Sequence, residues 1–103
     1  MNNRISQLLA FLQEDEADSF SRYALALEYL KDGNPSEAAF HFQMIVKMDS
    51  EYLAVYYQYG KLLESQGLIA EALSVFESGI EVARKQKNLH TLGELQSAID
   101  SMD

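Results

Sequence analysis

Two glutamate–histidine pairs are the residues of this sequence whose types and spacing could do chemistry. Glu37 precedes His41 by four positions, and His90 precedes Glu94 by four. Residues four apart lie on the same face of a helix, so each pair could give two ligands to a metal ion. Because no other candidate ligand clusters with either pair, we interpret both histidines as surface residues and predict no metal site.

The remaining residues lack the patterns that catalysis requires. The chain contains no cysteine, which excludes thiolate chemistry and disulfides, and its five glycines occur singly rather than in a phosphate-binding loop. No arrangement of serine, histidine and acid is recognisable. The acidic run EDEAD at 14–18 ends close to Asp18, which we expect to cap the next helix. These observations predict a protein that is not an enzyme and needs no cofactor.

Charge restricts the class of partner. The 103 residues carry a formal net charge of −8, and 48% of them are hydrophobic, as in one globular domain. This excess of carboxylates repels phosphate backbones and anionic lipid headgroups, so we expect neither a nucleic acid nor a membrane partner. A protein or peptide partner that is basic or amphipathic is favoured instead. Because cysteine is absent and no apolar run could span a bilayer, we expect a cytoplasmic location.

An internal repeat organises the elements that must position these residues. At an offset of 34 the sequence pairs Tyr23 with Tyr57, Gly33 with Gly67 and Phe42 with Phe76, and apolar positions between them recur at helical spacing. The C-terminal segment follows the same pattern if two extra residues are allowed before it. The pattern predicts six helices, over residues 3–14, 18–32, 35–48, 51–66, 69–86 and 89–101.

The segments ALALEYLKDGNPSEAAFHFQMIVKMD and YGKLLESQGLIAEALSVFESGIEVA resemble tetratricopeptide repeats. The resemblance implies an all-α fold, an α-α superhelix or solenoid of helix-turn-helix repeats, in a single domain over 1–103. It divides that domain into an N-terminal half-repeat helix at 1–16, repeats at 19–52 and 53–86, and a C-terminal capping helix at 89–101. The small residues Ala26, Gly60, Ala38 and Ala72 then mark close helix crossings, and Phe42 and Phe76 fill the space between layers.

The resemblance also implies a function, which is protein interaction through a concave groove lined by the first helix of each repeat. The predicted groove residues are Phe20, Tyr23, Leu27, Lys31, Ala54, Tyr57, Gln58, Lys61, Glu64 and Ser65. In the stretch AVYYQYG, helical periodicity places Tyr56 and Tyr59 in the core and Tyr57 in this groove. The sequence therefore predicts a scaffold or adaptor that binds a partner peptide or helix.

One part of the groove leaves alternatives open. Its first-repeat stripe, which includes Phe20, Tyr23 and Leu27, is much more apolar than the second-repeat stripe. This apolar array end could receive a partner peptide, or it could meet the same patch of a second copy in a homodimer that serves as a structural subunit. In a third arrangement the N-terminal helix covers the stripe, and no interface exists there.

Overall fold

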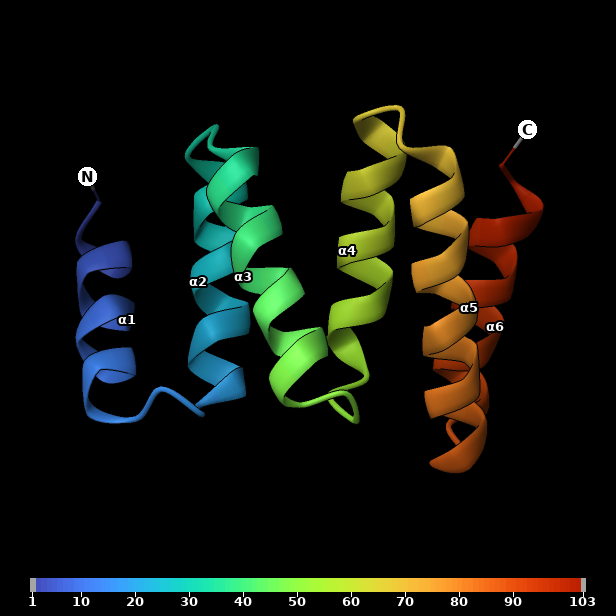
Figure 1. Cartoon of the computed structure of the whole chain (residues 1–103), viewed down its shortest axis with the longest axis horizontal. Helices are drawn as coiled ribbons and strands as arrows, with labels where there is room; N and C mark the ends of the chain where they lie inside the picture. Colours follow the sequence, from blue (N-terminus) through green and yellow to red (C-terminus); the bar gives the residue numbers. More distant parts are fainter. Residues whose placement is uncertain (1, 103) are drawn as a thin grey trace. The chain divides into compact units, whose positions relative to one another are not determined.

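The computed structural model describes residues 2–102, which form six α-helices and contain no strand (Figure 1). The helices are α1 (Asn3–Glu14), α2 (Ser19–Lys31), α3 (Pro35–Met48), α4 (Ala54–Ser65), α5 (Ile69–Lys85) and α6 (Leu89–Asp100). The all-α prediction is confirmed. None of the helices in the described part of the chain is both long enough and apolar enough to cross a membrane.

Four helices begin at a side-chain cap. The side-chain oxygens of Asn2, Asp18, Asn34 and Asn88 each accept a hydrogen bond from the backbone N–H three residues later. Each such bond satisfies one of the N–H groups that a helix start leaves without a partner. Asp18 also accepts a bond from the Ser21 hydroxyl, and these bonds lower the pKa of its carboxyl group. The predicted capping role of Asp18 is confirmed.

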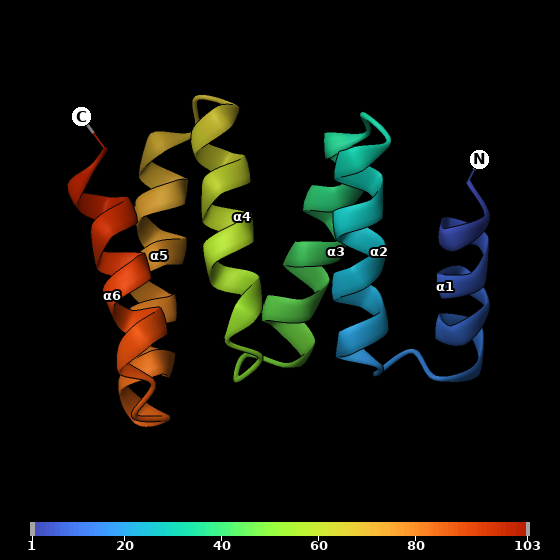
Figure 2. The same cartoon turned by 180° about the vertical axis from the view of Figure 1, so that it is seen from behind.

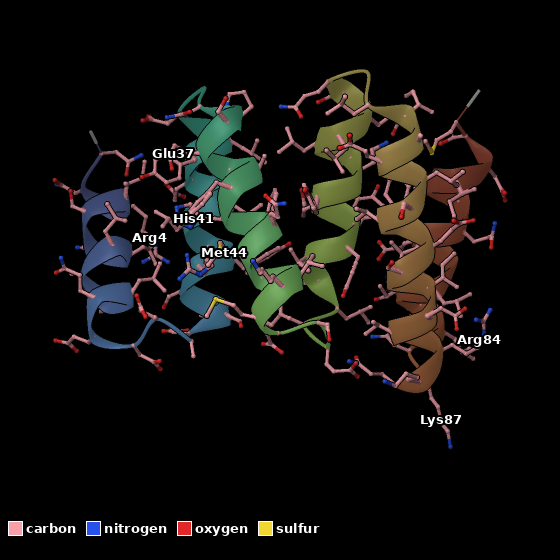
Figure 3. The ribbon with its side chains drawn as sticks, in the orientation of Figure 1. Arg4, Glu37, His41, Met44, Arg84 and Lys87 are labelled. Carbon is pink, nitrogen blue, oxygen red and sulfur yellow. The ribbon has the colours of Figure 1, made fainter. Side chains whose placement is uncertain are left out.

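Three helices end in a residue with left-handed backbone. Gly33 after α2 and Gly67 after α4 have φ of 75° and 79°, a conformation that glycine adopts without steric cost. At the corresponding place after α5, the chain has Lys87 with φ of 59° (labelled in Figure 3). A side chain makes this conformation costly, by about 1–2 kcal/mol relative to the right-handed region.

The predicted helix bounds agree with the structure to within one residue at each end, except at the start of α4. The prediction began that helix at residue 51, whereas it begins at Ala54. The backbone N–H of Tyr52 donates instead to the carbonyl of Asp49 in a turn, and the Tyr52 ring packs 5.6 Å from the ring of Tyr23. These contacts hold residues 49–53 outside the helix.

The chain divides into two compact units between Tyr52 and Leu53. The first unit contains α1, α2 and α3, and each helix packs against the next along the chain. Its core at the α1–α2 contact consists of Ile5, Leu8, Leu12 and Leu25. On the other side of α2, Ala26, Ala38 and Phe42 are fully buried, as the repeat pattern predicted.

The second unit contains α4, α5 and α6, and Figure 2 shows α6 from the side where it lies in front of α5. Its helices approach closely at two glycines. A Cβ atom on Gly60 would lie 2.3 Å from the ring of Phe76, and one on Gly79 would lie 2.5 Å from the Cβ of Tyr56. The prediction that Gly60 marks a close crossing, with Phe76 filling the adjacent space, is confirmed.

Candidate functional site

The second unit contains an open hollow of about 660 Å³ between α4 and α6. From α4 it is lined by Tyr57 and Lys61, two of the residues that the sequence analysis placed in a groove. From α6 and its C-cap, Ser101, it is lined by His90, Gly93, Glu94, Ser97, Ala98 and Ser101. The α6 residues were not predicted as site residues.

The α6 residues of this hollow follow the same stripe as the predicted residues of α4. With the two extra residues before α6, the offset becomes 36, so His90 corresponds to Ala54, Gly93 to Tyr57 and Ser97 to Lys61. The repeat alignment could therefore have predicted these α6 residues as part of the site. By this alignment, α4 and α6 occupy the same position in the repeat, that of its first helix. The hollow lies where the equivalent faces of these two helices meet.

The side chains of the hollow offer hydrogen-bonding and charged groups around an aromatic ring. Tyr57 is half-buried, with its ring centroid 6.5 Å from that of Phe76. Lys61 pairs with Glu64 at 3.3 Å, and His90 lies 3.8 Å from Glu94. Ser97 is exposed on α6, and Gly93 leaves open space where another residue would place a side chain.

The other predicted groove residues of α4 do not line the hollow. Gln58 and Glu64 are half-buried, whereas Ala54 and Ser65 are exposed. The Ser65 hydroxyl donates to the carbonyl of Leu62 at 2.7 Å, which is a local bond within the last turn.

The three tyrosines of the opening turns of α4 differ in burial. Tyr56 is only 2% exposed, so its predicted place in the core is confirmed. Tyr59 was predicted to be core as well, but it is half-buried. Its ring lies at the edge of the α4–α5 contact, where partial burial and the nearby Glu71 carboxylate raise the pKa of its hydroxyl.

The predicted groove residues of the first unit lie on α2. Phe20 is 69% exposed, and Lys31 is exposed and pairs with Glu28 at 3.5 Å. Tyr23 and Leu27 are half-buried, and the Tyr23 ring packs 6.2 Å from that of Phe42. The helix α1 packs on Leu25 rather than on Phe20, so it leaves the exposed end of this stripe uncovered.

A buried polar cluster in the first unit was missed by the sequence analysis. Arg22 is 9% exposed and His41 is 7% exposed, so the prediction that His41 is a surface residue is wrong. The Arg22 guanidinium donates from Nη1 to His41 Nδ1 at 3.0 Å and from Nη2 to the carbonyl of Glu16 at 3.1 Å. Arginine has no acceptor, so Nδ1 is the acceptor and the neutral imidazole carries its proton on Nε2.

The surroundings of His41 explain its burial. Its ring stacks on Tyr29, with centroids 5.7 Å apart and planes 6° apart, and Nε2 lies 3.8 Å from the Glu37 carboxylate. Figure 3 shows Glu37 and His41 following each other along α3. Burial and the Arg22 charge lower the pKa of His41 below its ordinary 6.5, while Glu37 opposes them. The cluster ties α2 and the α1–α2 linker to α3.

We expect acid to destabilise the protein through His41. Because the folded state holds this imidazole neutral, its contribution to stability is complete above the unfolded pKa of about 6.5 and is lost as the pH falls below that value toward the lowered folded pKa. Urea denaturation at about pH 7.5 and about pH 5.5 should therefore show a lower free energy of unfolding at the acid end.

Two variants test whether His41 causes this loss of stability at acid pH. Glutamine at position 41 can still accept a bond from Arg22 but does not titrate, so His41→Gln should flatten the pH dependence. His90 is exposed on α6, so His90→Gln should leave the dependence unchanged. If the free energy of unfolding changes equally with pH in the wild type and in His41→Gln, the His41 imidazole is not the titrating group.

Within residues 2–102, no group of three or more histidine, cysteine or acidic side chains is placed to hold a metal ion. His41 is engaged by Arg22 and Tyr29, and His90 faces Glu94 at an exposed position. Neither arrangement includes a nucleophile aligned with a base.

Sequence and structure comparisons agree on the family. The tetratricopeptide repeat sequence pattern matches residues 29–96. A tetratricopeptide repeat domain protein from Salinibacter ruber is 43% identical in both its crystal and its solution NMR structures, which cover 79% of this chain, with TM-scores of 0.75 and 0.76. The match covers 90% of the chain in the crystal structure and 82% of the chain in the NMR structure.

A third solved structure extends the match over almost the whole chain. It is the solution structure of a Bordetella parapertussis protein, 25% identical, with a TM-score of 0.80 and coverage of 97% of this chain and 87% of that one. No curated protein matches the sequence. The chain belongs to the tetratricopeptide repeat family, whose members are in general non-catalytic modules for protein–protein interaction.

Proposed function

We propose that this protein is a non-enzymatic scaffold or adaptor that binds a segment of a partner protein in the hollow between α4 and α6. The observation that carries the proposal is that the two walls of the hollow come from equivalent positions of the repeat. Tyr57 and Lys61 on α4 correspond to Gly93 and Ser97 on α6. In repeat proteins, equivalent positions on successive helices form one extended binding surface. The alignment of exposed polar groups along both walls supports recognition of an extended or helical peptide.

The charge of the chain supports a basic or amphipathic partner. The net charge is −8, and Glu94 contributes a carboxylate to the hollow itself. A partner with lysine or arginine beside an apolar residue would place its cation near Glu94 and its apolar side chain against the Tyr57 ring. Such attraction accelerates association and weakens as salt screens the charges.

Two arginine substitutions on α6 test this proposal. Ser97→Arg fills the hollow and adds a positive charge, so the tagged variant should lose the partner that the wild type captures from a lysate of the source organism. Gln96→Arg adds the same charge one residue away, outside the hollow, and should capture the partner normally. Capture that is equal for both variants would exclude the hollow as the binding site.

A second candidate function, self-association, is favoured by the exposure of Phe20. This ring is 69% exposed on α2, beside the half-buried Leu27. If two copies meet there, sedimentation should show a concentration-dependent dimer that Phe20→Glu converts to monomer, because a carboxylate in an apolar contact is strongly unfavourable. The matched variant Phe11→Glu alters another exposed phenylalanine, on α1, and should remain dimeric. A monomeric wild type at all concentrations would exclude this function.

A further inference from the structure

The first unit contains a second cavity, of about 250 Å³, beside the linker between α1 and α2. One wall is apolar and comes from α3, where Met44, Ile45 and Met48 line the space. Arg22 also lines it, held by its bonds to His41 and the Glu16 carbonyl. Methionine side chains are unbranched and flexible, so this wall can adapt to different apolar groups.

The apolar wall continues along the outer side of α3. Phe40, Met44 and Met48 follow one another four residues apart and therefore form one stripe. Phe40 is 52% exposed and Met48 is 50% exposed, and the Met44 side chain lies between them along the helix (labelled in Figure 3). We call these three residues the α3 stripe.

The repeat shows that the fold does not require apolar side chains at two of the three positions of the α3 stripe, whereas Met48 corresponds to Val82, which is buried. At the offset of 34, Phe40 corresponds to Ser74 and Met44 to Ser78 on α5. Both serines are exposed in the second unit, which forms the same helix pair without apolar side chains at these places. A packing role therefore does not account for the exposed Phe40 or the half-buried Met44.

The charges beside the cavity are mainly negative. Glu16 and Asp49 line it, and Glu14 and Asp15 precede Glu16 in the chain. On the positive side, Arg22 is buried and already hydrogen-bonded, while Lys47 is exposed on α3. An apolar stripe that ends in carboxylates is complementary to a segment that carries lysine or arginine next to its apolar side chains.

We propose that the α3 stripe and its cavity form a second docking surface, separate from the hollow between α4 and α6, for a basic amphipathic helix of a partner protein. One bulky apolar side chain of that helix enters the cavity between Met44 and Met48. Its lysine or arginine neighbours pair with Glu16 and Asp49. The remaining apolar side chains of the helix lie along the stripe toward Phe40.

A synthetic peptide of leucine and lysine, about 18 residues long to give five helical turns, tests this surface. With ¹³C-methyl-labelled methionines, the Met44 and Met48 signals should shift on titration at physiological salt, while the Met102 signal stays. A peptide with glutamate in place of lysine should not bind. Met48→Lys should weaken binding of the leucine–lysine peptide by about tenfold or more, through lost contact and added repulsion.

The control variant is Ser78→Lys, which adds the same charge at an exposed position of α5 and should bind like the wild type. Circular dichroism should show unchanged helix content for both variants, since both of the replaced side chains are exposed. If Met48→Lys and Ser78→Lys bind the leucine–lysine peptide with equal affinity, the binding is general charge attraction and the proposal is overturned. Methionine shifts that depend on protein concentration, without peptide, would make a second copy the occupant and also overturn it.

Discussion

Gly60→Ala should be among the most destabilising small substitutions in this protein. The added Cβ would lie 2.3, 2.6 and 2.7 Å from three ring atoms of Phe76, and that ring is fully buried. Because the Phe76 ring occupies the place of the added Cβ, either the buried ring or α4 itself must shift. We expect a loss of about 3 kcal/mol, at the upper end of the range for overpacked cores. Thermal melting should show a fall of about 4–8 °C for each kcal/mol lost.

Gly93→Ala is the matched control for this substitution. Gly93 is also inside a helix, but nothing lies within 4 Å of the place where its Cβ would be. Alanine is favoured over glycine in a helix by about 0.5–1 kcal/mol, so this variant should melt slightly higher than the wild type. If Gly60→Ala melts as high as Gly93→Ala, the close packing of α4 on α5 is not present in solution.

Tyr56→Ala should be still more damaging, whereas Tyr57→Ala should be mild. Tyr56 is 2% exposed and packs beside Gly79, and removing a buried aromatic side chain costs about 3–5 kcal/mol. Whole domains are stable by only about 5–15 kcal/mol, so Tyr56→Ala should leave the chain largely unfolded at moderate temperature. Tyr57 is half-buried and lines the hollow, so its truncation should mainly affect binding.

Chemical denaturation of the two tyrosine variants decides this assignment. The midpoint for Tyr56→Ala should fall well below that for Tyr57→Ala at the same pH and temperature. A larger loss for Tyr57→Ala would invert the assignment of the two faces of α4. The proposed site would then lose its α4 wall.

The sequence was most informative where packing leaves a residue-type signature. Glycine and alanine at close crossings, and phenylalanine between them, recur at the offset of 34, and the structure buries Gly60, Phe42 and Phe76 accordingly. Helix starts were predictable from cap residues such as Asp18 and Asn34, because their side chains bond to the backbone locally. Local hydrogen bonding and small-residue contacts are both visible in a single sequence.

Features that depend on distant pairs were not predictable in this way. His41 is buried because Arg22, nineteen residues earlier, approaches it across the α2–α3 contact. The sequence contains Arg22 and His41, but nothing in it indicates that the two side chains meet. The left-handed Lys87 gave no signal either, because the turn after α5 contains no glycine.

The sequence analysis predicted residues on only one of the two walls of the hollow, the α4 wall. Tyr57 and Lys61 were predicted from the polar side of the α4 stripe, whereas no α6 residue was predicted, because α6 was interpreted as a capping helix and not as a wall of the groove. The insertion changes the register of the repeat without changing the face that α6 presents. The alignment with two extra residues, applied to the groove positions, places His90, Gly93 and Ser97 at positions equivalent to Ala54, Tyr57 and Lys61.

The central claim is that a partner segment binds between α4 and α6, and a two-dimensional ¹⁵N NMR titration with the captured partner's binding segment tests it most directly. The largest amide shifts should fall on residues of both walls, at Tyr57, Lys61, Gly93 and Ser97. The amides of Glu77, Glu81 and Gln96, which line a separate surface, should change little. Shifts concentrated on those three residues, with the hollow unperturbed, would contradict the claim.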